Sequence, residues 1–208
     1  MIVYACSSNR AKLEELIIAG QASGIPSLRI EPLPGLQEIA APVENGATFE
    51  ENASLKAKSY SVLTKELVLA DDSGLEVAAL DGAPGIYSAR YASPNATDAA
   101  NNDLMLCRLE NQENREARFV CSVALARAGQ VLTIVRGSVE GEILKQPRGD
   151  RGFGYDPLFF YAPLGRTFAE LTRDEKLAVS HRGHALRNLF TYLAQFDRSN
   201  SARSGKIG

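Results

Sequence analysis

The stretch LVLADDSGLEV, residues 67–77, brings two adjacent aspartates to the end of an apolar run, and a second apolar run follows them. The first run is typical of a buried strand that ends at the acidic pair. Side chains alternate between the two faces of a strand, so Asp71 and Asp72 cannot share one partner. Two like charges beside a buried run carry an energetic cost. They therefore indicate a functional site, although Asp-Ser-Gly is also common turn chemistry.

The segments around this strand predict an α/β fold with a mixed sheet. The expected strands are residues 2–6 and 67–71 and a hairpin of residues 117–128 and 131–144, and the expected helices are residues 10–24, 48–65 and 97–110 and a last helix capped by Ser180. Thr48 and Glu51 form the pattern of a capping box. The glycine- and proline-rich residues 28–46, 80–95 and 146–159 predict loops. Residues 1–198 predict one domain, and the polar residues 199–208 predict a disordered tail.

The composition limits the classes of function. The chain has 208 residues, 45% of them hydrophobic, and its 23 basic and 25 acidic side chains give a net charge of -2. No overall positive field attracts nucleic acid, and no run of about 18 apolar residues predicts a membrane span. Cys6, Cys107 and Cys121 lack metal-binding spacing, which is typical of free thiols in a reducing compartment. The N-terminal residues do not form a signal peptide, so we expect a cytoplasmic protein that binds neither nucleic acid nor membrane.

A polar turn between the first strand and the first helix, SSNRAK at residues 7–12, is suited to a phosphate group. Free backbone N–H groups and the positive end of the helix dipole meet there. Ser7 and Asn9 can add donors, and Lys12 adds a charge. The turn lacks the Walker A pattern. The alternative is an ordinary helix cap with a solvated lysine.

The acidic residues are suited to a hard metal ion. Asp71, Asp72 and, in a loop upstream, Glu44 offer carboxylate oxygens, which Mg²⁺ binds while it keeps several waters. Such a group can hold Mg²⁺ against substrate phosphates while one carboxylate takes a proton from water. Zinc is disfavoured, because His181 and His184 have no cysteine or third histidine nearby.

The stretch RGFGYDP, residues 151–157, is suited to a flat ligand such as a nucleotide base. Its glycines let the backbone come close, Phe153 can stack on the base, and Asp156 can accept hydrogen bonds from the base edge. The alternative is a glycine-rich turn with Phe153 in the core.

The stretch EKLAVSHRGHAL, residues 175–186, gathers hydrogen-bond donors at a helix start. Lys176, His181 and Arg182 are cations or potential cations, and cations at this position oppose the helix dipole. They indicate an acceptor supplied from outside, although a solvated helix start is the alternative. Together the four segments describe a nucleoside triphosphate site.

In these motifs the chain resembles the inosine/xanthosine triphosphate pyrophosphatase family. The resemblance runs from Val3 to Phe196 and rests on SSNRAKLEEL, TFEENASLKA, ADDSGLEV with APGIYSARY, GFGYDPLF, ELTRDEK and SHRGHAL, in that order. It implies an elongated α/β fold with two lobes around a central nucleotide-binding cleft, a homodimer, and Mg²⁺ as cofactor. It also implies cleavage between the α and β phosphates, which yields a nucleoside monophosphate and pyrophosphate.

The resemblance further implies roles for individual residues. Asp72 matches the proton acceptor and, with Glu44, the metal ligands. The residues that match substrate contacts are Ser7, Ser8, Asn9, Lys12, Lys56, Ser73, Phe153, Gly154, Tyr155, Asp156, Lys176, His181 and Arg182. The family usually has Thr-Gly-Asn where this chain has Ser7-Ser8-Asn9. Ser8 thus replaces a glycine at a point where the backbone approaches phosphate closely.

We therefore expect a Mg²⁺-dependent hydrolase that removes ITP, dITP and XTP from the nucleotide pool. Two alternatives stay open at this stage. One is a Maf-like pyrophosphatase that acts on modified pyrimidines or on dTTP and UTP, and the other is a nucleotide sensor or RNA-binding module without catalysis. The acidic residues argue against the sensor, since carboxylates repel phosphates unless a metal ion lies between them.

Overall fold

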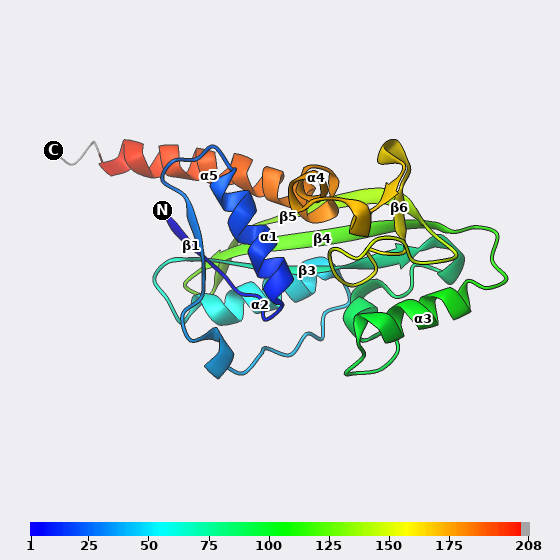
Figure 1. The fold of residues 1–208 in the computed structure, drawn as a ribbon. Helices are drawn as coiled ribbons and strands as arrows, with labels where there is room; N and C mark the ends of the chain where they lie inside the picture. Colours follow the sequence, from blue (N-terminus) through cyan, green and yellow to red (C-terminus); the bar gives the residue numbers. More distant parts are fainter. Residues whose placement is uncertain (205–208) are drawn as a thin grey trace.

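Seven strands form one mixed sheet in the computed structural model, which describes the backbone of residues 1–204 and the side chains through Arg198. The strand order is β2-β1-β3-β4-β5-β6-β7 (Figure 1). β1 pairs in parallel with β2 and β3, and the pairs from β3 to β7 are antiparallel. The strands are β1 Ile2–Ala5, β2 Arg29–Pro32, β3 Leu67–Val77, β4 Glu116–Arg127, β5 Gln130–Ile143, β6 Phe159–Tyr161 and β7 Arg166–Thr167. The predicted α/β fold with a mixed sheet is confirmed.

Helices cover both faces of this sheet. The α-helices of the described range are α1 Arg10–Gln21, α2 Phe49–Ser61, α3 Asp98–Arg108, α4 Arg173–Val179 and α5 His181–Ser204, and the short 3₁₀ helices are η1 Leu36–Glu38, η2 Ala78–Leu80, η3 Gly85–Arg90, η4 Ala162–Leu164 and η5 Phe168–Glu170. Leu67 and Leu69 of β3 pack with α1 and α5, whereas Val68 and Ala70 pack with α2. None of these helices is long and apolar enough to cross a membrane.

β3 does not end at the acidic pair. Its residues pair with β4 without interruption from Val68, opposite Ala126, to Val77, opposite Ala117. The predicted strand end at Asp71, and the alternative of an Asp-Ser-Gly turn, are both wrong. The long hairpin of β4 and β5 supplies a partner for every residue of this stretch, so pairing overrides the local turn preference.

A gap in the sheet edge lies in the middle of β3. β1 ends at Ala5, opposite Leu69. Further along, the same side of β3 is covered again, where the N–H of Leu75 donates to Ser88 Oγ of η3 at 2.9 Å. Between these points, at residues 71–74, the described residues place no strand on this side of β3, whose other side pairs with β4. We call these residues the free edge.

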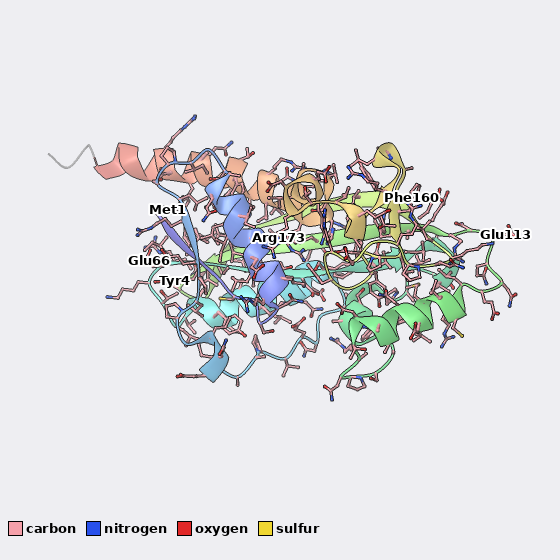
Figure 2. The ribbon with its side chains drawn as sticks, viewed as in Figure 1. Met1, Tyr4, Glu66, Glu113, Phe160 and Arg173 are labelled. Carbon is pink, nitrogen blue, oxygen red and sulfur yellow. The ribbon has the colours of Figure 1, made fainter. Side chains whose placement is uncertain are left out.

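The free edge lies between two apolar cores. Leu69 belongs to the core beneath α1 and α5, and Leu75 belongs to a separate core that includes residues of α3, β6 and η5. The molecule is elongated along β3, β4 and β5, with Met1 at one end and Glu113 and Phe160 at the other (Figure 2). These two cores lie on either side of the free edge, and the division into two lobes stays a prediction.

The predicted elements are present with changed ends. α1 ends at Gln21 and α2 ends at Ser61, each a few residues before its predicted end. The hairpin turns at Ala128 and Gly129, which both have positive φ. β2 and α4 lie in segments for which the sequence predicts no regular element.

The start of α2 and the end of α5 differ from the predictions. Thr48 Oγ1 accepts the N–H of Glu51 at 3.1 Å, but the Glu51 carboxylate accepts the N–H of Ala47 at 2.6 Å and not that of Thr48, so only half of the predicted capping box forms. The predicted start of the tail, Ser199, falls within α5, which runs through Ser204. Residues 205–208 of the predicted tail lie outside the described residues.

Candidate active site

The two aspartates of the free edge point to opposite faces of the sheet. Asp71 faces α1 and α5, where its Oδ2 lies 3.4 Å from Lys12 Nζ and 3.2 Å from Arg182 Nη2. Asp72 faces α2, where Oδ2 accepts from Asn52 Nδ2 at 3.1 Å. This arrangement follows from the alternation of side chains along a strand. The sequence argument that the two carboxylates have separate partners is confirmed.

The two carboxyl groups differ in pKa. Burial raises the pKa of Asp71, but the charges of Lys12 and Arg182 lower it more, so it lies well below the usual range for aspartate. Burial also raises the pKa of Asp72, and the charge of Lys56 does not bring it back to the ordinary value. Asp71 is therefore a fixed anion, whereas Asp72 is the better proton acceptor of the pair.

Glu44 and Asp72 lie around one ammonium group. Lys56 Nζ is 3.2 Å from Glu44 Oε2 and 3.6 Å from Asp72 Oδ1. Burial lowers the pKa of Lys56, but Asp72, Asp71 and Glu44 raise it more, so Lys56 stays charged. A nucleotide phosphate placed here would meet a cation that two carboxylates already hold in position.

The donor set at Glu44 and Asp72 fits Mg²⁺. No group of three or more histidine, cysteine, aspartate or glutamate side chains in the described part of the chain could hold a metal ion alone. Mg²⁺ commonly binds one or two carboxylates and takes its remaining ligands from water and substrate phosphates. Glu44 and Asp72, two carboxylates around one ammonium group, meet that requirement.

The polar turn before α1 is folded as a helix cap. Asn9 is the N-cap, and its Oδ1 accepts the N–H of Lys12 at 3.1 Å. The Ser7 Oγ accepts the N–H of Asn9 at 3.3 Å. Asp81 and Ala128 are the non-glycine residues with positive φ in the described range, so Ser8 does not occupy a backbone conformation that needs glycine. The exchange of glycine for Ser8 therefore causes no backbone strain.

The Phe153 ring lies beside two cations. Lys176 Nζ is 4.4 Å from the ring centroid, and the Arg182 Cζ is 5.7 Å from it. The buried Asp156 does not face open space, because its Oδ2 accepts from Lys176 Nζ at 2.6 Å and from the N–H of Phe153 at 2.9 Å. A Cβ at Gly152 would lie 2.1 Å from that same oxygen, so this loop requires glycine there. Asp156 thus fixes the loop that carries Phe153.

His181 and Arg182 are both buried, at the first turn of α5. The His181 ring stacks on Phe119 with centroids 4.7 Å apart, and Nδ1 has no hydrogen-bond partner among the described residues. Burial and the nearby charges of Arg182 and Lys176 hold the pKa of His181 well below its usual range. The ring is neutral, so one nitrogen donates and the other accepts.

Arg182 is engaged more fully than the sequence predicts. Its Nη1 donates to Glu15, and Nη2 donates to Asp71 and to Ser73 Oγ at 3.0 Å. Of the three guanidinium nitrogens of Arg182, only Nε has no hydrogen-bond partner among the described residues. The interpretation of Arg182 as a donor that waits for an outside acceptor is therefore corrected. These hydrogen bonds join α5 to α1 and β3.

Sequence reasoning missed Glu15, Asn52 and Asp98. Glu15 lies one turn after Lys12 and contacts Lys176 Nζ at 2.9 Å, so its carboxylate links Lys176 of α4 to Arg182 of α5. The Asp98 Oδ2 accepts the N–H of Gly154 at 2.6 Å. The spacing of Glu15 from Lys12 is a helical signal that could have identified it. Asn52 and Asp98 carry no comparable signal in the sequence.

All of the residues predicted for the base pocket, Phe153 to Asp156, Lys176, His181 and Arg182, line one small cavity of about 100 Å³. It is lined by Asn9, Lys12, Ser73, Gly74, Ser88, Ala89, Asp98, Asn101, Phe119, Phe153, Gly154, Tyr155, Asp156, Lys176, His181 and Arg182. Glu44, Lys56 and Asp72 lie on the other face of β3. The cavity and these three residues come together only around the free edge, so a ligand that contacts both must extend across that edge.

A larger groove of about 750 Å³ lies elsewhere, between α1, α4 and α5. Its lining is mostly apolar, and Asp174 and Arg187 are its charged members. It lacks the convergent polar groups of a catalytic site. The candidate active site is therefore the small cavity together with the acidic residues across the free edge.

The fold and these side chains define a class of α/β proteins in which the free edge of a mixed sheet lies beside two carboxylates, three lysines that are buried or partly buried, and an aromatic pocket. Residues 3–192 match the model of the Ham1 family, and the chain belongs to that family. It is 49% identical over 197 residues to the dITP/XTP pyrophosphatase of Exiguobacterium sp., covering 94% of this chain and 98% of that protein. It is 56% identical over 189 residues to the dITP/XTP pyrophosphatase of Syntrophobacter fumaroxidans, covering 90% and 80%.

Solved structures agree with this assignment. The Staphylococcus aureus Ham1 protein matches with a TM-score of 0.82 and 37% identity, covering 94% of this chain and 99% of that one. A HAM1 protein from Coxiella burnetii matches with a TM-score of 0.83 and 40% identity over the same shares of the two chains. The family resemblance inferred from the sequence motifs is confirmed.

Proposed function

We propose that this protein hydrolyses the non-standard purine nucleoside triphosphates ITP, dITP and XTP to the monophosphate and pyrophosphate, and so clears them from the nucleotide pool. One observation carries the proposal. At the free edge, a carboxylate with a raised pKa, Asp72, lies against a charged lysine, Lys56, and an aromatic pocket lies on the opposite face of β3. Hydrolysis of a nucleoside triphosphate needs a proton acceptor, a cation that binds phosphate and a pocket for the base.

The triphosphate lies across the free edge in this proposal. Lys12 and the start of α1 bind phosphate from one face of the sheet, and Lys56 binds it from the other. The base enters the small cavity beside Phe153. Because the two groups of residues lie on opposite faces of β3, only a ligand with separate phosphate and base parts engages both.

Asp72 accepts a proton from the water that attacks the α-phosphorus. Pyrophosphate leaves as one unit, and the charges of Lys12 and Lys56 stabilise it as it departs. Glu44 and Asp72 would hold Mg²⁺, which would polarise the phosphate oxygens and the nucleophile when bound. Asp71 remains paired with Lys12 and so orients it for the phosphate.

Base choice follows from the oxygen at purine position 6. Hypoxanthine and xanthine present an acceptor there, and the Arg182 Nε and the His181 Nδ1, which have no partner among the described residues, can donate to it. Adenine presents an amino donor, which leaves these buried donors unpaired. A site built for a hydrogen bond can reject an analogue that lacks it by about 10⁴–10⁵. Guanine keeps the oxygen, so its amino group at position 2 must be excluded by the backbone of the loop at Gly154, a weaker barrier.

A panel of nucleoside triphosphates with and without Mg²⁺, scored for pyrophosphate, tests the proposal. We expect pyrophosphate from ITP, dITP and XTP only when Mg²⁺ is present. Faster release from dTTP or UTP would favour a Maf-like pyrophosphatase, and binding without release would favour a nucleotide sensor. A homodimer and a cytoplasmic location remain part of the proposal.

A further inference from the structure

Asn52 of α2 joins the two acidic parts of the site. Its side chain is buried, with 1% of the residue exposed. Its Nδ2 donates to Asp72 Oδ2 at 3.1 Å, and its Oδ1 accepts the N–H of Gly46 at 2.9 Å. One amide therefore bridges the strand that carries Asp72 and the loop that carries Glu44.

Close packing holds the loop end of this bridge. A Cβ at Gly46 would lie 2.8 Å from the Asn52 Oδ1, so only glycine lets the loop come this near. The next residue, Ala47, donates its N–H to the Glu51 carboxylate at 2.6 Å. Two successive N–H groups of the loop are thus tied to side chains at the start of α2.

Lys56 contacts the same two carboxylates but is a poorer anchor. It lies one helical turn after Asn52, on the same face of α2. Its ammonium is a point charge that substrate phosphates attract, so its contacts with Glu44 and Asp72 compete with substrate binding. A neutral amide has no such competition, and it leaves the charge of Asp72 in place.

We propose that Asn52 is a positioning residue that fixes the orientation of the Asp72 carboxylate and the position of the Glu44 loop relative to it. The inference rests on the proposed function. Asn52 contacts neither the attacking water nor the substrate phosphates. It acts through its hydrogen bonds to Asp72 and Gly46. Its loss should lower the rate of the chemical step and leave substrate affinity unchanged.

Two substitutions separate the two ends of the bridge. Asn52→Ala removes both hydrogen bonds. Asn52→Asp keeps the acceptor for Gly46 but removes the donor to Asp72. For both variants we expect kcat for ITP to fall about 10–100-fold, the usual range for a supporting residue, with KM unchanged. Exchange of the Gly46 amide proton, followed by NMR, should speed up in Asn52→Ala and stay slow in Asn52→Asp.

Ser122→Ala is the matched control. Ser122 lies directly opposite Asp72 on β4, is fully buried, and its Oγ has no hydrogen-bond partner among the described residues. Its truncation perturbs the same place without removing a bond, so kcat should stay at the parent value. An equal loss of kcat in Ser122→Ala would overturn the inference, because general packing would then explain the effect.

The remaining outcomes are also decisive. If Asn52→Ala melts at a lower temperature but its folded fraction keeps the parent kcat, Asn52 is only a structural residue. A rise in KM at constant kcat would place Asn52 in substrate binding and overturn its role through Asp72. A parent protein that releases no pyrophosphate overturns the proposed function itself, whereas an active parent matched by its Asn52 variants overturns only this inference.

Discussion

The two neighbouring aspartates of β3 should respond in opposite ways to the same substitution. Asp71→Asn removes a buried charge that pairs with Lys12 and Arg182, and Arg182 is 1% exposed. Breaking such a pair usually costs about 3–5 kcal/mol, because the partner charge stays buried. The new amide can still accept from Arg182, so we expect the lower end, about 3 kcal/mol. At about 2–4 °C per kcal/mol for a domain of this size, Tm should fall by about 6–12 °C.

Asp72→Asn should spare the fold and stop the reaction. Burial raises the pKa of Asp72 in the folded protein, so its ionised form costs stability above the pKa of the unfolded chain. A neutral amide removes that cost, and Tm should stay at the parent value or rise. The lost proton acceptor should lower kcat by about 10²–10⁴-fold.

Thermal unfolding followed by circular dichroism and steady-state pyrophosphate release measure both effects. Asp81→Asn, at an exposed turn position, is the control and should match the parent in both assays. The reasoning fails if Asp72→Asn melts below Asp71→Asn, or if folded Asp72→Asn keeps near-normal turnover. Either result would mean that the roles of the two carboxylates are exchanged or shared.

Further outcomes follow from the same site. Because the raised pKa of Asp72 must be exceeded for it to act as a base, the acidic limb of the kcat/KM profile, which reports the free enzyme, should lie above the ordinary aspartate value of about 3.9; a limb at or below that value contradicts this. Chelation of Mg²⁺ with EDTA should abolish pyrophosphate release and leave Tm unchanged, and an equal fall in both would indicate a structural metal. His181→Phe keeps the stack on Phe119 but removes the ring nitrogens, and should lower the ITP rate more than the ATP rate; an unchanged ratio removes His181 from base selection. Burial raises the pKa of Cys6 and Cys121 to about 12, so mass spectrometry after brief alkylation should find the label on the exposed Cys107 alone.

The main features of the fold could be predicted because they depend on local patterns. The apolar run before Asp71 and the alternation of side chains predict that the two aspartates face different partners. The extent of β3 could not be predicted, because Asp-Ser-Gly favours a turn and only the pairing with β4 opposes it. β2 has four residues and ends in Pro32, so its sequence carries almost no strand signal.

The residues of the site could be predicted from the sequence, but their interaction partners could be predicted less well. The sequence indicates that Arg182 is a polar group at a helix start, but its partners Glu15 and Asp71 lie 167 and 111 residues away. Such pairs form only when the sheet brings α1, β3 and α5 together. Asn52 was missed because an asparagine inside a helix has no distinctive pattern, and its function depends on two contacts in three dimensions.

Hydrolysis of ITP in ¹⁸O-labelled water, with the products separated and analysed by mass spectrometry, tests the central claim most directly. Attack of water on the α-phosphorus with pyrophosphate as leaving group predicts that the label appears in IMP, that pyrophosphate is unlabelled, and that no IDP accumulates. Label in orthophosphate together with IDP would mean stepwise removal of phosphates. That result would contradict the placement of Lys12, Lys56 and Asp72 around one transferring group.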